Sequence, residues 1–142
     1  MSGLLNNCVE KLIAACIGAG IIHVVIGDWT PILRVLAILV VADTISGLAV
    51  AWRANKIKSA ALKDGALKLL IYACLIAVFY QLGTVVESLQ FARDAVAVYL
   101  ALTEGVSVVE NAANLGVKIP PGVLSLLRLE LSKHEKPADP PS

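Results

Sequence analysis

The chain has 142 residues, of which 58% are hydrophobic and only 16% are charged, with a formal net charge of +1. A soluble domain of this size usually carries about 25% charged residues, so the composition excludes an ordinary soluble domain and indicates one unit embedded in lipid. Lys and Arg fall into a few blocks between apolar runs, and this distribution does not favour nucleic-acid binding.

Four apolar stretches follow one another along the chain, at about residues 12–26, 32–52, 67–86 and 95–109. The second and third each supply about 20 residues, which match a hydrocarbon core of roughly 30 Å at a rise of 1.5 Å per residue. The first is shorter than a usual span, so it is expected either to cross as a thin or tilted helix or to lie at the interface. The pattern predicts an all-α bundle of about four transmembrane helices.

The second stretch has the clearest signs of a membrane crossing. Trp29 and Trp52 lie at its two ends, about 34 Å apart along a helix, and indole rings favour the two membrane interfaces. Pro31 stands where a helix can begin without losing a needed N–H group.

The region after the fourth stretch is more polar. Residues 123–131 are leucine-rich and amphipathic, so they are expected to lie on the membrane surface or to pack on a neighbouring helix. Residues 132–142 hold three of the six prolines and are expected to form a disordered polar tail. Residues 1–131 are therefore predicted to form a single membrane domain.

Basic residues predict the orientation of the bundle. A cluster of five lies between the second and third stretches: Arg53, Lys56, Lys58, Lys63 and Lys68. Because cytoplasmic loops are enriched in Lys and Arg, this loop is expected in the cytoplasm, where it could also attract anionic lipid headgroups. With four crossings, both termini are then cytoplasmic as well.

Acidic side chains occur inside two of the predicted spans. Asp43 lies near the middle of the second span, where a carboxylate costs about 2.5 to 3.5 kcal/mol to insert and should have a partner. Ser46 and Gly47 share its helix face. On the fourth span a polar stripe is formed by Glu104, Ser107, Glu110 and Asn111, and Gly105 ends a run of small residues, at intervals of four, that lets helices approach closely.

Two interpretations of these stripes remain open. In one they hold together the helices of a single subunit. In the other they meet between subunits and line a wet path when an assembly opens. The three cysteines show no metal-ligand spacing, and the chain has no catalytic or nucleotide-binding motif, so neither an enzyme nor a metal or cofactor site is expected.

Several segments, in order, resemble the toxin-secretion/phage-lysis holin family, also called phage holin family four. The similar segments are 43–47, the basic loop with Lys58 and Ser59, 65–68, 104–111 and 115–120, within about residues 33–125. Thr103 departs from the Asn that the family often has before the Glu, and the tail is proline-rich rather than a long charged run.

The resemblance implies a multi-pass protein of the bacterial inner membrane. Such proteins form homo-oligomers and open holes through which a muralytic enzyme, the endolysin, or a large toxin leaves the cytoplasm, which leads to host cell lysis. The matching positions are Asp43, Ser46, Gly47, Glu104, Gly105, Ser107, Glu110 and Asn111. The main alternative is a small ion or proton channel or transporter subunit that uses Asp43 and Glu104, and a second is a membrane scaffold that conducts nothing.

Overall fold

The computed structural model describes residues 11, 16, 18–20, 23–55 and 59–135, with the side chains of 59–64 excepted. Its elements are α2 (Pro31–Arg53), α3 (Ser59–Val85), the short 3-10 helix η1 (Glu87–Leu89), α4 (Ala92–Asn114) and α5 (Pro121–Glu135). The described part of the chain is thus helical and contains no strand, as the sequence predicted. Most of the first apolar stretch, 12–26, lies outside the described residues, although positions 18–20 and 23–26 are helical.

Three helices are long and apolar enough to cross a membrane: Pro31–Arg53, Gly65–Val85 and Glu87–Asn114. They enclose the second and fourth predicted stretches and cover all of the third, 67–86, except its last residue. Among the described residues, three helices are therefore candidate membrane spans. The fourth crossing, which was expected at 12–26, is not one of these three. The protein is a helical membrane protein with at least these three candidate spans.

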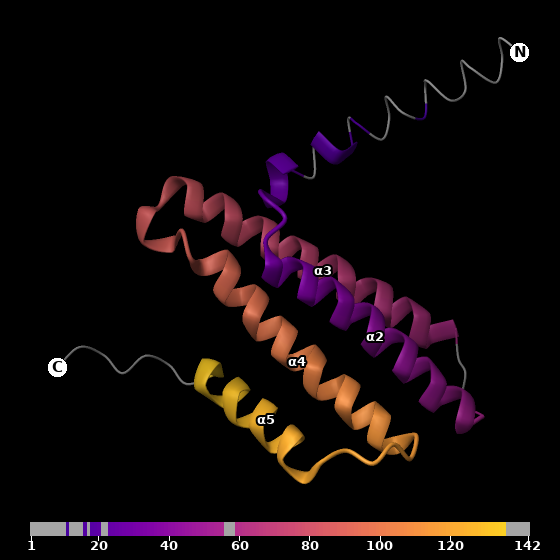
Figure 1. Ribbon diagram of the computed structural model, residues 1–142. Helices are drawn as coiled ribbons and strands as arrows, with labels where there is room; N and C mark the ends of the chain where they lie inside the picture. The colour runs from indigo at the N-terminus through magenta and orange to yellow at the C-terminus, as the bar shows by residue number, and fades with distance from the viewer. Residues whose placement is uncertain (1–10, 12–15, 17, 21–22, 56–58, 136–142) are drawn as a thin grey trace, which may run out of the picture.

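Helix α4 lies at the centre of the bundle. It packs against α2 on one side, against α3, and against α5 on the side away from them (Figure 1). Its small residues Ala97 and Ala101 are 0% and 6% exposed, and they let the leucines of α2 approach its backbone. The run of small residues predicted from the sequence is thus a contact surface within one chain.

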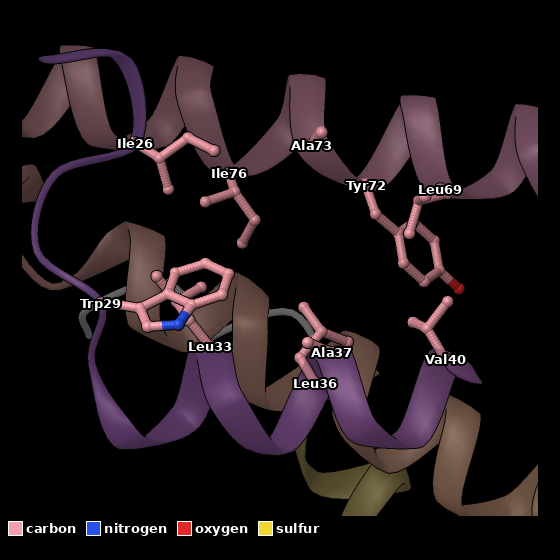
Figure 2. A pocket seen from close by; sticks show the side chains of 10 residues that line it. All are labelled: Ile26, Trp29, Leu33, Leu36, Ala37, Val40, Leu69, Tyr72, Ala73 and Ile76. Atoms are coloured by element: carbon pink, nitrogen blue, oxygen red, sulfur yellow. The ribbon is translucent and has the colours of Figure 1, made fainter. Parts of the chain in front are cut away.

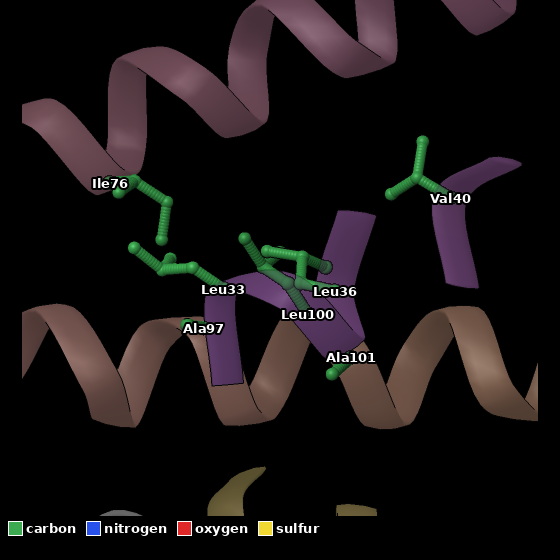
Figure 3. Packing of buried hydrophobic residues seen from close by; sticks show 7 residues of the cluster. All are labelled: Leu33, Leu36, Val40, Ile76, Ala97, Leu100 and Ala101. Carbon is green, nitrogen blue, oxygen red and sulfur yellow. The ribbon is translucent and has the colours of Figure 1, made fainter. Parts of the chain in front are cut away.

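The apolar core joins three helices (Figure 3). Its members are Leu33, Leu36 and Val40 of α2, Ile76 of α3, and Ala97, Leu100 and Ala101 of α4. Most other large apolar side chains of α2 and α3 are exposed, for example Ile38 at 68% and Val78 at 53%. Exposed apolar faces of this extent are expected when hydrocarbon is the solvent.

Local sequence explains where the helices begin and end. Pro31 and Pro121 stand in the first turns of α2 and α5, where no intrahelical N–H bond is lost. Gly116, with φ +90°, follows the end of α4 in the left-handed conformation that commonly ends a helix. Between α3 and α4, a Cβ on Gly83 would lie 2.9 Å from the carbonyl oxygen of Leu89, so only glycine permits this close turn.

The C-terminal helix differs from the predicted boundaries. The amphipathic segment was expected at 123–131 and the disordered tail from 132, whereas α5 continues to Glu135. Residues 136–142 of the predicted tail lie outside the described residues.

Candidate functional site

Three ionisable side chains meet at similar depths on the three spans. Asp43 lies ten residues before the end of α2, Lys68 nine residues after the start of α3, and Glu104 ten residues before the end of α4. At 1.5 Å per residue, each is about 14 to 15 Å from the end of its helix. They therefore come together close to the middle of the bundle.

Lys68 connects the two carboxylates. Its Nζ lies 2.5 Å from Oδ2 of Asp43 and 2.8 Å from Oε2 of Glu104. One ammonium group thus joins α2, α3 and α4. The sequence prediction placed Lys68 among the basic residues that face lipid headgroups, but in the structure its amine points into the bundle.

The remaining carboxylate oxygens also accept hydrogen bonds. The Tyr72 hydroxyl donates to Oε1 of Glu104 at 2.7 Å, and Nδ2 of Asn111 donates to Oδ1 of Asp43 at 3.1 Å. Glu104 is 1% exposed, and burying a carboxyl group without such partners is energetically costly. All four carboxylate oxygens therefore have a donor within the protein.

A second layer of polar contacts extends the network toward the end of α4. Nδ2 of Asn111 also donates to the Ser46 hydroxyl at 3.1 Å, and that hydroxyl donates to the backbone oxygen of Asp43. Gly47 lies beside this contact, where an added Cβ would be 3.6 Å from Nδ2 of Asn111. The polar faces predicted on the second and fourth spans therefore meet inside one chain, and we call Asp43, Ser46, Lys68, Tyr72, Glu104 and Asn111 the central polar network.

The central polar network is suited to holding helices together in a medium without water. Breaking a buried ion pair by removing one partner typically costs 3 to 5 kcal/mol, because the other charge is left uncompensated. Two carboxylates face one ammonium, so the three formal charges sum to −1. Within the described residues, no three His, Cys, Asp or Glu side chains gather as the ligands of a metal ion would.

An apolar hollow lies beside the network, between α2 and α3 (Figure 2). It is lined by Ile26, Trp29, Leu33, Leu36, Ala37, Val40, Leu69, Tyr72, Ala73 and Ile76. The ring of Tyr72 faces this hollow while its hydroxyl reaches Glu104. α2 and α3 touch each other little directly, so the central polar network and α4 join them.

At each end of the bundle, an arginine side chain donates hydrogen bonds to backbone oxygens of another segment. Arg93, at the start of α4, donates to the backbone oxygens of Ile26 and Asp28 at 3.1 and 3.4 Å, and its guanidinium lies 5.4 Å from the centre of the Tyr80 ring. At the opposite end, Nη1 of Arg53 donates to the carbonyl oxygen of Leu115 at 2.7 Å. Trp29 and Trp52 are both exposed at the ends of α2, as expected for side chains at membrane interfaces.

The other predicted site residues lie outside the central polar network. Gly105 faces Leu127 of α5, Glu110 forms an ion pair with Arg128 of α5, and the Ser107 hydroxyl donates to the Thr103 carbonyl of its own helix. Of the predicted basic loop, Lys56 and Lys58 lie outside the described residues, as does the side chain of Lys63.

Sequence reasoning missed Lys68 and Tyr72 as partners of the carboxylates. A usable signal was present, because the two residues are four apart on one helix face. The predicted spans did not show that the three side chains share one level, because Lys68 is the second residue of the stretch 67–86, whereas α3 begins eight residues earlier, at Ser59.

Comparisons with known proteins agree with this picture. The family pattern described as the bacteriophage holin family matches residues 20–130. The chain is similar to an uncharacterized protein of Listeria innocua, with 28% identity over 120 residues that cover 80% of this chain and 86% of the relative. An uncharacterized protein of Listeria monocytogenes is 27% identical over the same shares. No solved structure matches.

Proposed function

The chain belongs to the bacteriophage holin family, and we propose that it assembles from several copies in the bacterial cytoplasmic membrane into holes that release a muralytic enzyme or a toxin. The family match shows that the chain is a holin-type membrane protein. The homo-oligomer, the hole and the endolysin that leaves through it are the proposal. The observation that supports the proposal most is the central polar network, which holds charged and polar side chains inside a bundle whose outer surface is apolar.

The central polar network gives a physical reason for switch-like opening. In hydrocarbon, Asp43 and Glu104 are tolerable only while Lys68 and the neutral donors cover them. A partly separated bundle would leave a carboxylate unpaired, at a cost of about 3 to 5 kcal/mol. Water that enters as the helices separate would replace those donors. Separation and wetting are therefore coupled, and intermediate states are disfavoured.

The orientation that we propose follows the basic residues. The connection between α2 and α3 faces the cytoplasm, and the turn around η1 faces outward. The α4–α5 connection then starts on the cytoplasmic side, where Arg53 bonds to Leu115. The N-terminus and the end of α4 are proposed to be cytoplasmic, as expected for an even number of crossings that includes the first apolar stretch.

A small ion or proton channel or transporter subunit is the second candidate. It is favoured by one observation: two carboxylates share one lysine, so the network carries an excess negative charge that a proton or a monovalent cation could neutralise. Such a protein would pass small ions selectively and retain cytoplasmic proteins.

Induced expression in bacteria separates the two candidates. Membrane potential is recorded together with the release of a cytoplasmic enzyme of known size. The proposal predicts that the potential collapses and that the enzyme escapes to the cell wall space within the same interval. Loss of potential with full retention of the enzyme would contradict the holin and support the channel.

A further inference from the structure

Helix α5 turns back along α4 instead of continuing away from the bundle (Figure 1). Leu127 lies beside Gly105, where an added Cβ would be 3.9 Å from Cδ2 of that leucine. Farther along, His134 and Glu135 line a hollow together with Ala95, Val96 and Tyr99 of α4. α5 therefore runs antiparallel to α4 and reaches the level of its first turns.

This position places α5 at the depth of a membrane span. Gly105 follows Glu104, which belongs to the central polar network near mid-span. Leu127 is thus at the level of the network, and the residues after it lie beside the half of α4 that begins at Ala92.

Only one narrow face of α5 is covered. Leu124, Leu127 and Leu131, at spacings of three and four, are half-buried, and every other residue of the helix is exposed. The exposed residues include four that carry formal charge: Arg128, Glu130, Lys133 and Glu135. Arg128 pairs with Glu110 and still remains 59% exposed.

Charged side chains at this depth cannot face hydrocarbon without a large cost. Lys133 donates a hydrogen bond to Oε2 of Glu130 at 2.7 Å, and both side chains of this pair are at least half exposed. The faces of α2 and α3 are different, because their exposed side chains are apolar, as at Ile38 and Val78. α2 and α3 therefore present an apolar surface to lipid, whereas the exposed surface of α5 carries charged side chains beside Leu126 and Leu129.

We propose that the exposed face of α5 lines the water-filled path through the assembled protein. The inference rests on the proposed function and names the element that faces the lumen. Two positive and two negative charges lie on this helix, so the path it lines has little charge selectivity. A weakly selective wall suits the passage of a folded protein better than the passage of one ion.

The test combines a depth measurement and a water-access measurement in a background whose three native cysteines are replaced by alanine. For depth, Tyr99→Cys is combined with His134→Cys and treated with a short bifunctional thiol reagent in the membrane. Tyr99→Cys with Lys118→Cys is the matched control, because Lys118 lies in the α4–α5 connection at the other end of α4. The first pair is expected to be cross-linked and the control pair is not.

For water access, Ser132→Cys is compared with Ile38→Cys, which lies near the same depth on the lipid-facing side of α2 and is 68% exposed. Both are treated with a membrane-impermeant maleimide after permeabilisation. Because a thiol reacts as the thiolate, which forms in water, Ser132→Cys is expected to react at least about tenfold faster.

Failure to cross-link Tyr99→Cys to His134→Cys would overturn the inference, because α5 would then lie elsewhere. Cross-linking with equal, slow labelling of Ser132→Cys and Ile38→Cys would also overturn it, because the face of α5 would be covered. Enzyme release from the same cells is measured in parallel. Its absence would count against the proposed function, whereas release without labelling would count against the α5 inference alone.

Discussion

The Nζ atom of Lys68 lies 2.8 Å from Oε2 of Glu104, so a carboxylate that is 1% exposed is paired with an ammonium group from a neighbouring span. The same amine also reaches Asp43 at 2.5 Å. Each of the three long helices therefore contributes one charge to a contact that none of them could bury alone.

Replacing Lys68 by methionine should destabilise the bundle more than any other single change in the central polar network. Both carboxylates would lose their cation, and the expected loss in the free energy of unfolding is about 3 to 5 kcal/mol. Thermal unfolding in detergent micelles measures it, with Lys118→Met outside the spans as the control. A triple variant, Asp43→Asn, Lys68→Met and Glu104→Gln, should recover most of the loss. Equal stability of K68M and the unmodified protein would refute the pairing.

Replacing Tyr72 by phenylalanine should give a smaller effect. The change removes the hydroxyl that donates to Oε1 of Glu104 and leaves the ring in the apolar hollow between α2 and α3. A buried acceptor without its donor costs about 1 to 3 kcal/mol. Tyr99→Phe, which removes a hydroxyl from α4 outside the network, is the comparison in the same unfolding measurement. If both variants lose the same stability, Tyr72 has no special role toward Glu104.

Gly83 should not accept even a methyl group. A Cβ at this position would lie 2.9 Å from the Leu89 carbonyl oxygen, so Gly83→Ala must displace the turn between α3 and α4. Overpacking of this kind costs about 1 to 3 kcal/mol. Gly65→Ala is the matched control, because its Cβ would be 3.9 Å from the nearest side chain, that of Thr44. Protease resistance in micelles should fall for the first variant only, and equal resistance of the two would show that the turn is not tightly packed.

Single cysteines test the proposed orientation in intact, non-permeabilised cells. Ser88→Cys, in η1, should react with an impermeant maleimide added outside, and Ala54→Cys, after α2, should be protected. Both positions are exposed, so packing does not decide the outcome. The reverse pattern would mean that the basic loop does not set the topology.

The sequence predicted the spans of α2, α3 and α4 well, because hydrocarbon thickness fixes how many apolar residues a crossing needs. It also predicted that Asp43 and Glu104 need partners, since an isolated carboxylate in lipid is too costly. Their shared partner was missed. Lys68 continues a block of basic residues, and a one-dimensional pattern does not show which way a lysine at the edge of a span turns.

The position of α5 could also not be predicted from the sequence. Its amphipathic pattern suits a membrane surface and a neighbouring helix equally well. The choice depends on the groove that α2 and α4 form with Val35, Leu39, Ala101 and Gly105, and this groove exists only after those helices have packed. Helix propensity and hydrophobic periodicity describe one helix at a time, so they do not predict contacts between helices.

The central claim is that the central polar network keeps the bundle closed and must be wetted when it opens. The most direct measurement is the time from induction to enzyme release for Glu104→Gln, with Glu110→Gln, in the exposed pair with Arg128, as the control at equal protein level. E104Q removes the buried negative charge that pairs with Lys68, so the contact between α3 and α4 is weakened and enzyme release should begin earlier. For E110Q, release should begin on the normal schedule. Release of both variants at the time of the unmodified protein would contradict the claim.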